Sequence, residues 1–120
     1  ARAMVDWTAG LNPDMTRALH TQGKEIYWNY RDMEPLYSES WARSLGEAVG
    51  YQPIKLSGSD AGYKDWFIAA YGRPGFTIEL GEGVNPLPLE DMAALKQDTH
   101  HILSQAMKLL IGSGNAGRAD

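Results

Sequence analysis

Residues 75–81 read GFTIELG, and this stretch contains the clearest β-strand of the sequence. Aromatic, β-branched and aliphatic residues from Phe76 to Leu80 favour an extended chain, and glycines bound the run on both sides. Glu79 is the one charged residue in it. Because charged residues are rarely buried unless they are paired or functional, Glu79 is either a buried general base or a strand-end residue that faces water.

The segments around this strand alternate between helical and extended patterns. Further strands are predicted at 15–21, 25–30 and 52–56, and helices at 1–10, 37–49, 63–71 and 89–111. Gly50 suits the C-cap of the second helix, and Pro53 favours an edge strand or a strand start. This alternation is typical of an α/β sheet with helices on its faces. We expect one domain over residues 1–111 and a flexible, Gly-rich tail over 112–120.

The composition limits the partners of the chain. Its 120 residues suit a single domain, and 43% hydrophobic with 22% charged residues is ordinary for a soluble globular protein. A net charge of −4 without a run of Lys or Arg argues against a nucleic-acid partner. No apolar stretch approaches the roughly 18–20 residues that span a bilayer. The chain has no cysteine, so a zinc ion would need His, Asp or Glu ligands, and the compartment stays undetermined.

His20 is the second candidate for chemistry. It stands where the predicted strand 15–21 gives way to a glycine-containing loop. Ligand sites of α/β sheets lie at the carboxyl ends of strands, which makes His20 a candidate ligand; the alternative is an ordinary surface or core-edge histidine. His100 and His101 are weaker candidates, because neighbouring residues of a helix point in different directions and do not chelate one metal as an i, i+4 pair does.

Two stretches, ALHTQGKEIYW at 18–28 and GFTIELG at 75–81, resemble the M14 metallocarboxypeptidase family, and most closely its bacterial γ-D-glutamyl-diaminopimelate peptidases. Three further segments fall in the order of that family: KDWF at 64–67, YGRPG at 71–75 and NPLP at 85–88. The resemblance covers residues 1 to about 111. It implies the C-terminal half of a mixed eight-stranded sheet with flanking helices, with about four strands and three to four helices here. It also implies that the strand ending at His20 lies beside the Glu79 strand.

The resemblance assigns roles to three residues and suggests a fourth. His20 corresponds to one ligand of a catalytic zinc, and Glu79 to the carboxylate that takes a proton from the zinc-bound water and delivers it to the leaving amine. Lys64 falls in the specificity pocket, where it would suit a substrate with an extra carboxylate; the alternative is an exposed lysine at a helix start. The family's mobile tyrosine has no clear counterpart in the flexible loop 57–62, and nearby Tyr63 is taken as a substrate-binding residue.

The departures from the family predict an incomplete site. No His-x-x-Glu occurs in these 120 residues, so two of the three expected zinc ligands are missing, as is the arginine region that grips the substrate's carboxylate. We therefore expect the chain alone to bind zinc weakly or not at all and to lack peptidase activity. The strand 15–21 would lack a partner on its outer side, which predicts self-association or pairing with a missing N-terminal half.

Two non-enzymatic alternatives remain. The first is a peptide-binding module on the same scaffold, and the second is a plain interaction domain in which His20 and Glu79 are structural. A buried Glu79 within reach of His20 would argue against the second, whereas side chains on opposite faces would favour it.

Overall fold

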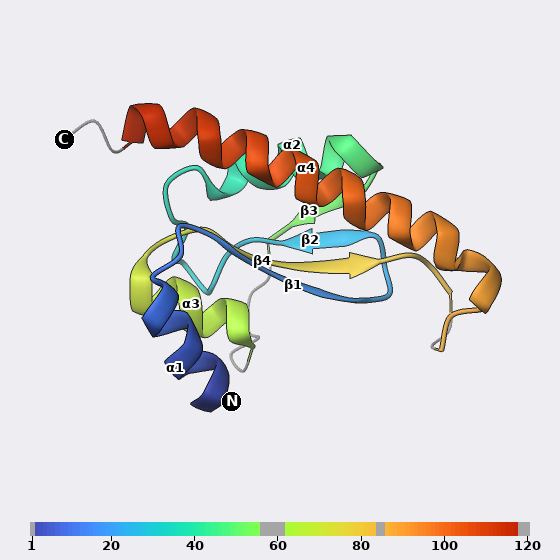
Figure 1. Ribbon diagram of the computed structural model, residues 1–120, viewed down its shortest axis with the longest axis horizontal. Helices are drawn as coiled ribbons and strands as arrows, with labels where there is room; N and C mark the ends of the chain where they lie inside the picture. Colours follow the sequence, from blue (N-terminus) through green and yellow to red (C-terminus); the bar gives the residue numbers. More distant parts are fainter. Residues whose placement is uncertain (1, 56–61, 84–85, 118–120) are drawn as a thin grey trace.

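The computed structural model describes residues 2–55, 62–83 and 86–117, with side chains up to residue 112. At its centre is a four-stranded mixed sheet in the order β1-β4-β2-β3 (Figure 1). The strands are β1 (Thr16–Thr21), β2 (Glu25–Tyr27), β3 (Gln52–Ile54) and β4 (Gly75–Leu80). β4 runs parallel to β1 and antiparallel to β2, and β3 runs parallel to β2. The predicted α/β class, the four strands and the placement of β1 beside β4 are confirmed.

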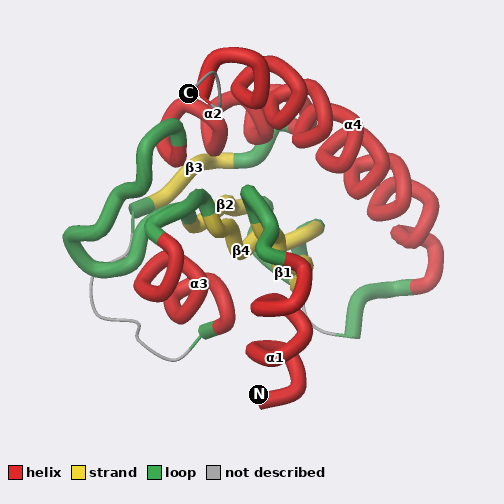
Figure 2. Tube along the Cα trace, turned by 60° about the vertical axis from the view of Figure 1, so that its left-hand side comes forward, coloured by secondary structure: helices red, strands yellow, loops and turns green. Residues whose placement is uncertain are grey.

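Four helices cover the two faces of the sheet in the described part of the chain. They are α1 (Arg2–Leu11), α2 (Ser38–Val49), α3 (Tyr63–Tyr71) and α4 (Met92–Gly117), and a short 3-10 turn, η1 (Leu89–Asp91), precedes α4. α2 and α4 lie together on one side of the sheet, and α1 and α3 lie on the other (Figures 1 and 2). None of the helices within these residues is long and apolar enough to cross a membrane.

The hydrophobic core lies between the sheet and the layer formed by α2 and α4. Because alternate residues of a strand point to opposite faces, β4 divides its side chains between two environments. Phe76, Ile78 and Leu80 are buried in this core, whereas Thr77 and Glu79 are half-buried on the other face. The helices contribute buried apolar side chains to the same core: Trp41, Ala42, Leu45, Ile102 and Ala106.

Tyr51 ties the end of β4 to α4. Its buried hydroxyl donates a hydrogen bond to Asp98 Oδ2 at 2.7 Å and accepts one from the Gly81 N–H at 3.3 Å. Burial and the hydrogen bond to Asp98 raise the pKa of Tyr51 to about 12. The turn that follows Glu79 is therefore fixed against the core.

Several boundaries differ from the sequence prediction. β2 ends at Tyr27 rather than at residue 30, because the chain turns back there and Tyr30 pairs with Met33 through two backbone hydrogen bonds. β3 is likewise shorter than predicted and ends at Ile54. Helix α4 continues to Gly117 instead of ending at 111, since isolated glycines weaken a helix by about 1 kcal/mol each without ending it. Most of the expected flexible loop, at 57–61, and the last residues of the expected tail, 118–120, lie outside the described residues.

Candidate functional site

His20 and Glu79 occupy equivalent positions on the two neighbouring parallel strands. Their Cα atoms are register partners in the pairing of β1 with β4, so both side chains leave the sheet on the same face. They line one cavity of about 250 Å³ together with Ala18, Thr77 and Tyr27 from the sheet. The first turn of α3, with Gly62 before it, forms the remaining wall of this cavity. The structure thus brings together all four residues that the sequence singled out: His20, Tyr63, Lys64 and Glu79.

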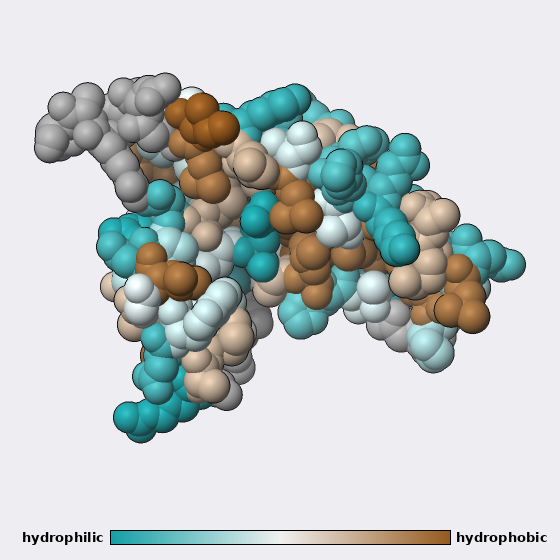
Figure 3. Space-filling model, in the orientation of Figure 1, coloured by the Kyte–Doolittle hydropathy of each residue, from teal (hydrophilic) through white to brown (hydrophobic). Residues whose placement is uncertain are grey.

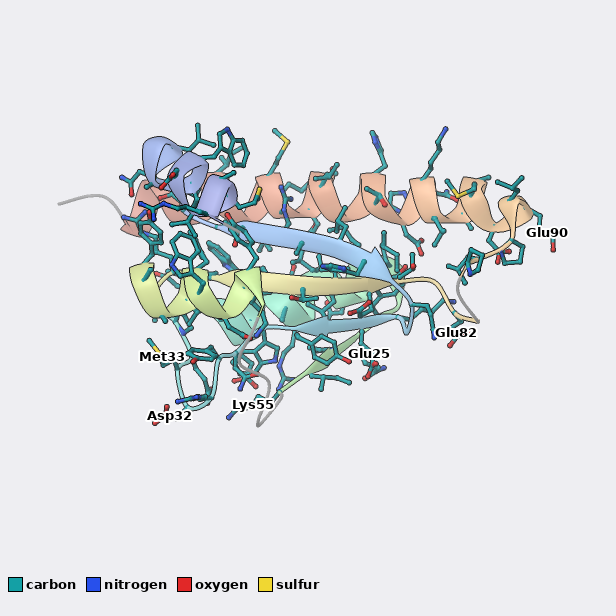
Figure 4. All side chains as sticks on the ribbon, turned by 90° about the horizontal axis from the view of Figure 1, so that it is seen from below. Glu25, Asp32, Met33, Lys55, Glu82 and Glu90 are labelled. Atoms are coloured by element: carbon teal, nitrogen blue, oxygen red, sulfur yellow. The ribbon has the colours of Figure 1, made fainter. Side chains whose placement is uncertain are left out.

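Figure 4 looks onto this face of the sheet. Helix α3 covers only one end of the strands there, and the other end is left open. His20 is exposed and Glu79 is half-buried, so Glu79 is neither fully enclosed nor a freely solvated strand end. The two side chains share a face, and the arrangement expected of a purely structural pair, with opposite faces, is not found.

Two glycines hold the loops after β1 and β4 close together. The Gly23 N–H donates a hydrogen bond of 2.7 Å to the Gly81 carbonyl, which joins the loop beyond His20 to the turn beyond Glu79. Gly23 has a φ of +141°, and a Cβ there would come within 3.1 Å of Glu25 Oε1 and 3.7 Å of Glu79 Cβ. A side chain at position 23 would therefore be strained and would crowd the cavity end of β4.

Lys64 is buried at the start of α3, with 6% of its surface exposed. Its ammonium donates to the Asn29 carbonyl and, at 2.6 Å, to Asp65 Oδ1. Asp65 Oδ2 in turn accepts from the Gly62 N–H at 3.3 Å, at the N-terminus of the helix. The alternative of an exposed helix-start lysine is wrong, because the ammonium is folded under the helix against Asn29. An ammonium has three N–H donors, and two of them are used by the residues that the structure describes.

The hydroxyl of Tyr63 forms a hydrogen bond with Thr8 of α1. It lies 2.6 Å from Thr8 Oγ1, and because Thr8 already donates to the Met4 carbonyl, Tyr63 is the donor. The ring packs on Trp66 with centroids 5.9 Å apart. Tyr63 therefore lines the cavity while its hydroxyl is engaged with Thr8.

Tyr27 is a cavity residue that the sequence analysis missed. Its hydroxyl donates to Glu25 Oε1 at 3.0 Å, and Tyr27 and Glu25 are register partners of Thr77 and Glu79. Burial, this hydrogen bond and the charges of Glu25 and Glu79 raise the pKa of Tyr27 above its ordinary value. Period-two alternation in β2 shows that Glu25 and Tyr27 share a face, but only the pairing of β2 with β4 places that face at the cavity.

The described residues do not form a metal site by themselves. No group of three or more His, Cys, Asp or Glu side chains within 2–55, 62–83 and 86–117 is arranged to hold a metal ion. A catalytic zinc takes three protein ligands, and His20 offers one nitrogen beside the carboxylate of Glu79. These two residues suit a ligand and an unliganded base, but they do not make up the full set.

No family model matches the chain. Over 98 residues, which is 82% of this chain, it is 45% identical to the γ-D-glutamyl-L-diamino acid endopeptidase 1 of Lysinibacillus sphaericus. It is also 42% identical over 97 residues, 79% of its length, to YqgT, an uncharacterised protein of Bacillus subtilis (strain 168). The matched region makes up 25% and 26% of these two relatives. The chain therefore spans about a quarter of the length of the curated relatives it matches, and it is related to part of a peptidase.

Proposed function

We propose that this chain is part of a zinc-dependent peptidase of the M14 carboxypeptidase type, which cleaves γ-D-glutamyl-diaminopimelate bonds in cell-wall peptides. Within it, His20 is one metal ligand and Glu79 is the general base. The observation that carries the proposal is the pairing of His20 with Glu79 at the same level of two parallel strands, facing one cavity. The likeness to a γ-D-glutamyl-L-diamino acid endopeptidase supports the substrate class.

Glu79 is suited to proton transfer by its position. It is half-buried, lies beside His20 and has no cationic partner among the described residues, so its carboxylate is available to a water in the cavity. From there it accepts the proton of the attacking water and returns it to the leaving amine. A zinc ion, held by His20 and by ligands from outside the described residues, would supply a lowered water pKa and a polarised carbonyl.

Lys64 is proposed to recognise a carboxylate of the substrate. Its third N–H has no partner among the described residues. Lys64 lines the cavity and lies in the first turn of α3, where the helix dipole also favours negative charge. The charge of Lys64 is partly balanced by Asp65, so the cavity offers a directed donor more than a free positive charge.

The residues that complete the zinc site are proposed to dock along β1. Among the described residues β1 has a single neighbour, β4, and its last three residues are exposed. Figure 3 shows apolar side chains gathered along α4 and toward β1 on this side of the molecule. Leu19, Leu103 and Met107 are 40%, 41% and 61% exposed. Where the completing residues are absent, we expect copies of the chain to associate through this edge, and a sedimentation profile of monomer at high concentration would contradict that.

A peptide-binding module without catalysis is the second candidate. It is favoured by one observation, the lack of a three-residue metal-binding group in the part of the chain that the structure describes. Such a module would keep the cavity and its Lys64 without turnover.

The test uses the longest protein that the gene encodes around this sequence. We expect it to release diaminopimelate from L-Ala-γ-D-Glu-meso-diaminopimelate, measured by chromatography. Glu79→Gln should lower the rate about 10²–10⁴-fold with the zinc content unchanged, because it removes the base but no ligand. His20→Ala should instead lower the zinc content, measured by elemental analysis. Glu82→Gln is the matched control, since Glu82 is exposed beyond the end of β4 (Figure 4).

Either of two results would contradict the proposal that the protein is a peptidase. One is a zinc-loaded protein that does not cleave this peptide, which would favour the binding module. The other is a Glu79→Gln variant that is as active as the Glu82→Gln control.

A further inference from the structure

The cavity has a second polar corner at Tyr27 of β2, separate from Lys64, and Glu25 lies next to this corner on the same face of the sheet. Two rows of side chains cross β1, β4 and β2 on the face that α3 partly covers. Register places His20, Glu79 and Glu25 in one row, and Ala18, Thr77 and Tyr27 in the next. The Tyr27 hydroxyl joins the two rows by its 3.0 Å hydrogen bond to Glu25 Oε1.

The carboxylates at this corner have no ion-pair partner in the part of the chain that the structure describes. Lys64 is paired with Asp65, and the two other ion pairs between described residues, Arg43–Glu39 and Lys55–Glu34, are elsewhere on the chain. Glu25 and Glu79 have no such partner among the described residues, although they are register neighbours. Like charges on adjacent strands destabilise the sheet, so a cation at this corner would relieve the repulsion.

Tyr27 and Glu25 offer acceptors with a fixed direction. The Tyr27 hydroxyl donates its hydrogen bond to Glu25, so the lone pairs of its oxygen can accept hydrogen bonds from a ligand. Tyr27 also lines the cavity. Glu25, next to the cavity lining, has a second carboxylate oxygen, and Thr77 adds a hydroxyl within the cavity from the neighbouring strand. Oxygen acceptors of this kind match an ammonium group, which is a compact donor of three hydrogen bonds.

We propose that Tyr27 and Glu25 bind an ammonium group of the ligand while Lys64 binds its carboxylate. The cavity therefore recognises a zwitterionic amino-acid end, and a dicarboxylate without an amine fits it less well. The inference rests on the proposed function for its substrate class, and it adds the part of the cavity that distinguishes an amino acid from a plain acid.

Binding of two free acids tests the proposal without any turnover. The protein used in the activity assay is titrated in a calorimeter with meso-diaminopimelate and with pimelate, the same seven-carbon diacid without amines. We expect diaminopimelate to bind about tenfold more tightly than pimelate, which is about 1.4 kcal/mol, since only diaminopimelate has an ammonium group that Tyr27 and Glu25 can bind. Glu25→Gln should abolish most of that preference and leave pimelate binding within about twofold. Tyr27→Phe should reduce the preference by about threefold.

Glu82→Gln removes one carboxylate outside the cavity and should leave both affinities unchanged. Melting temperatures identify any variant that is unfolded, and the glutamine at position 25 can still accept the hydrogen bond of Tyr27. The proposal is overturned if wild-type protein binds the two acids equally or binds neither, or if Glu25→Gln weakens both to the same extent. Peptide cleavage with equal affinity for the two acids would contradict this inference alone. Tighter binding of diaminopimelate without cleavage would contradict the proposed function alone.

Discussion

The two faces of the sheet differ in their surroundings although they share the same strands: one packs in an apolar core and the other borders a cavity. Toward α2 and α4, Phe76 and Ile78 are fully buried in an apolar core. Toward α3, Thr77 and Glu79 from the same strand border a polar cavity, and α3 covers only part of that face (Figure 4). Alternate residues of β4 therefore belong to different environments: the even-numbered residues 76–80 pack in the core, and Thr77 and Glu79 line the cavity. The pleat of β4 thus separates the core from the candidate site, so substitutions can perturb the two separately.

The exception to this separation is Lys64, which is buried on the cavity side. Lys64→Met should lower the free energy of unfolding by about 3–5 kcal/mol, because it leaves the buried Asp65 carboxylate without its cation. Lys55→Met is the matched control: Lys55 pairs with Glu34 at 2.6 Å at an exposed site, where solvent screens the pair, so its loss should leave the free energy of unfolding almost unchanged. Urea denaturation measures both. Equal effects of the two variants would contradict a stabilising role of the buried Lys64–Asp65 pair.

Neighbouring residues of β4 test the two faces directly. Ile78→Ala should lower the free energy of unfolding by about 2–5 kcal/mol, because it opens a cavity in the core. Thr77→Ala, one residue away on the half-buried face, should lower it by less than about 1 kcal/mol. Chemical denaturation of both variants gives the comparison, and a Thr77 effect as large as that of Ile78 would contradict the division.

The core face also contains Tyr51, whose ionisation should make the free energy of unfolding depend on pH. The pKa of Tyr51 is raised to about 12 from an ordinary value of 10, so the folded state holds this proton more tightly than the unfolded state. That contribution is complete below pH 10 and is lost as the pH rises to about 12, a decrease of about 2–3 kcal/mol. Tyr51→Phe should lack this part of the decrease. Denaturation curves of both proteins between pH 9 and 12 measure the difference, and parallel curves would refute the assignment to Tyr51.

Local signals in the sequence were enough for much of the fold. The strand at 75–80, the helix at 63–71 and the glycine that ends α2 all follow from patterns within a few residues. The neighbouring positions of His20 and Glu79 required the family resemblance, because strand order is not encoded locally. Interactions between distant segments were out of reach: the contact of Lys64 with Asn29 spans 35 positions, and Tyr27 reaches the cavity only through antiparallel pairing with β4.

The shared register of His20 and Glu79 has a consequence for how the sequence can change in length. A side chain in a strand changes face with every residue, so deleting or inserting one residue early in β1 would send His20 to the α4 face and bring a neighbour, such as Leu19, to the cavity. A change of two residues would restore the face. Length changes in β1 should therefore be tolerated, if at all, in even steps, while the loop between Thr21 and Glu25 is limited separately by the bond from Gly23 to Gly81.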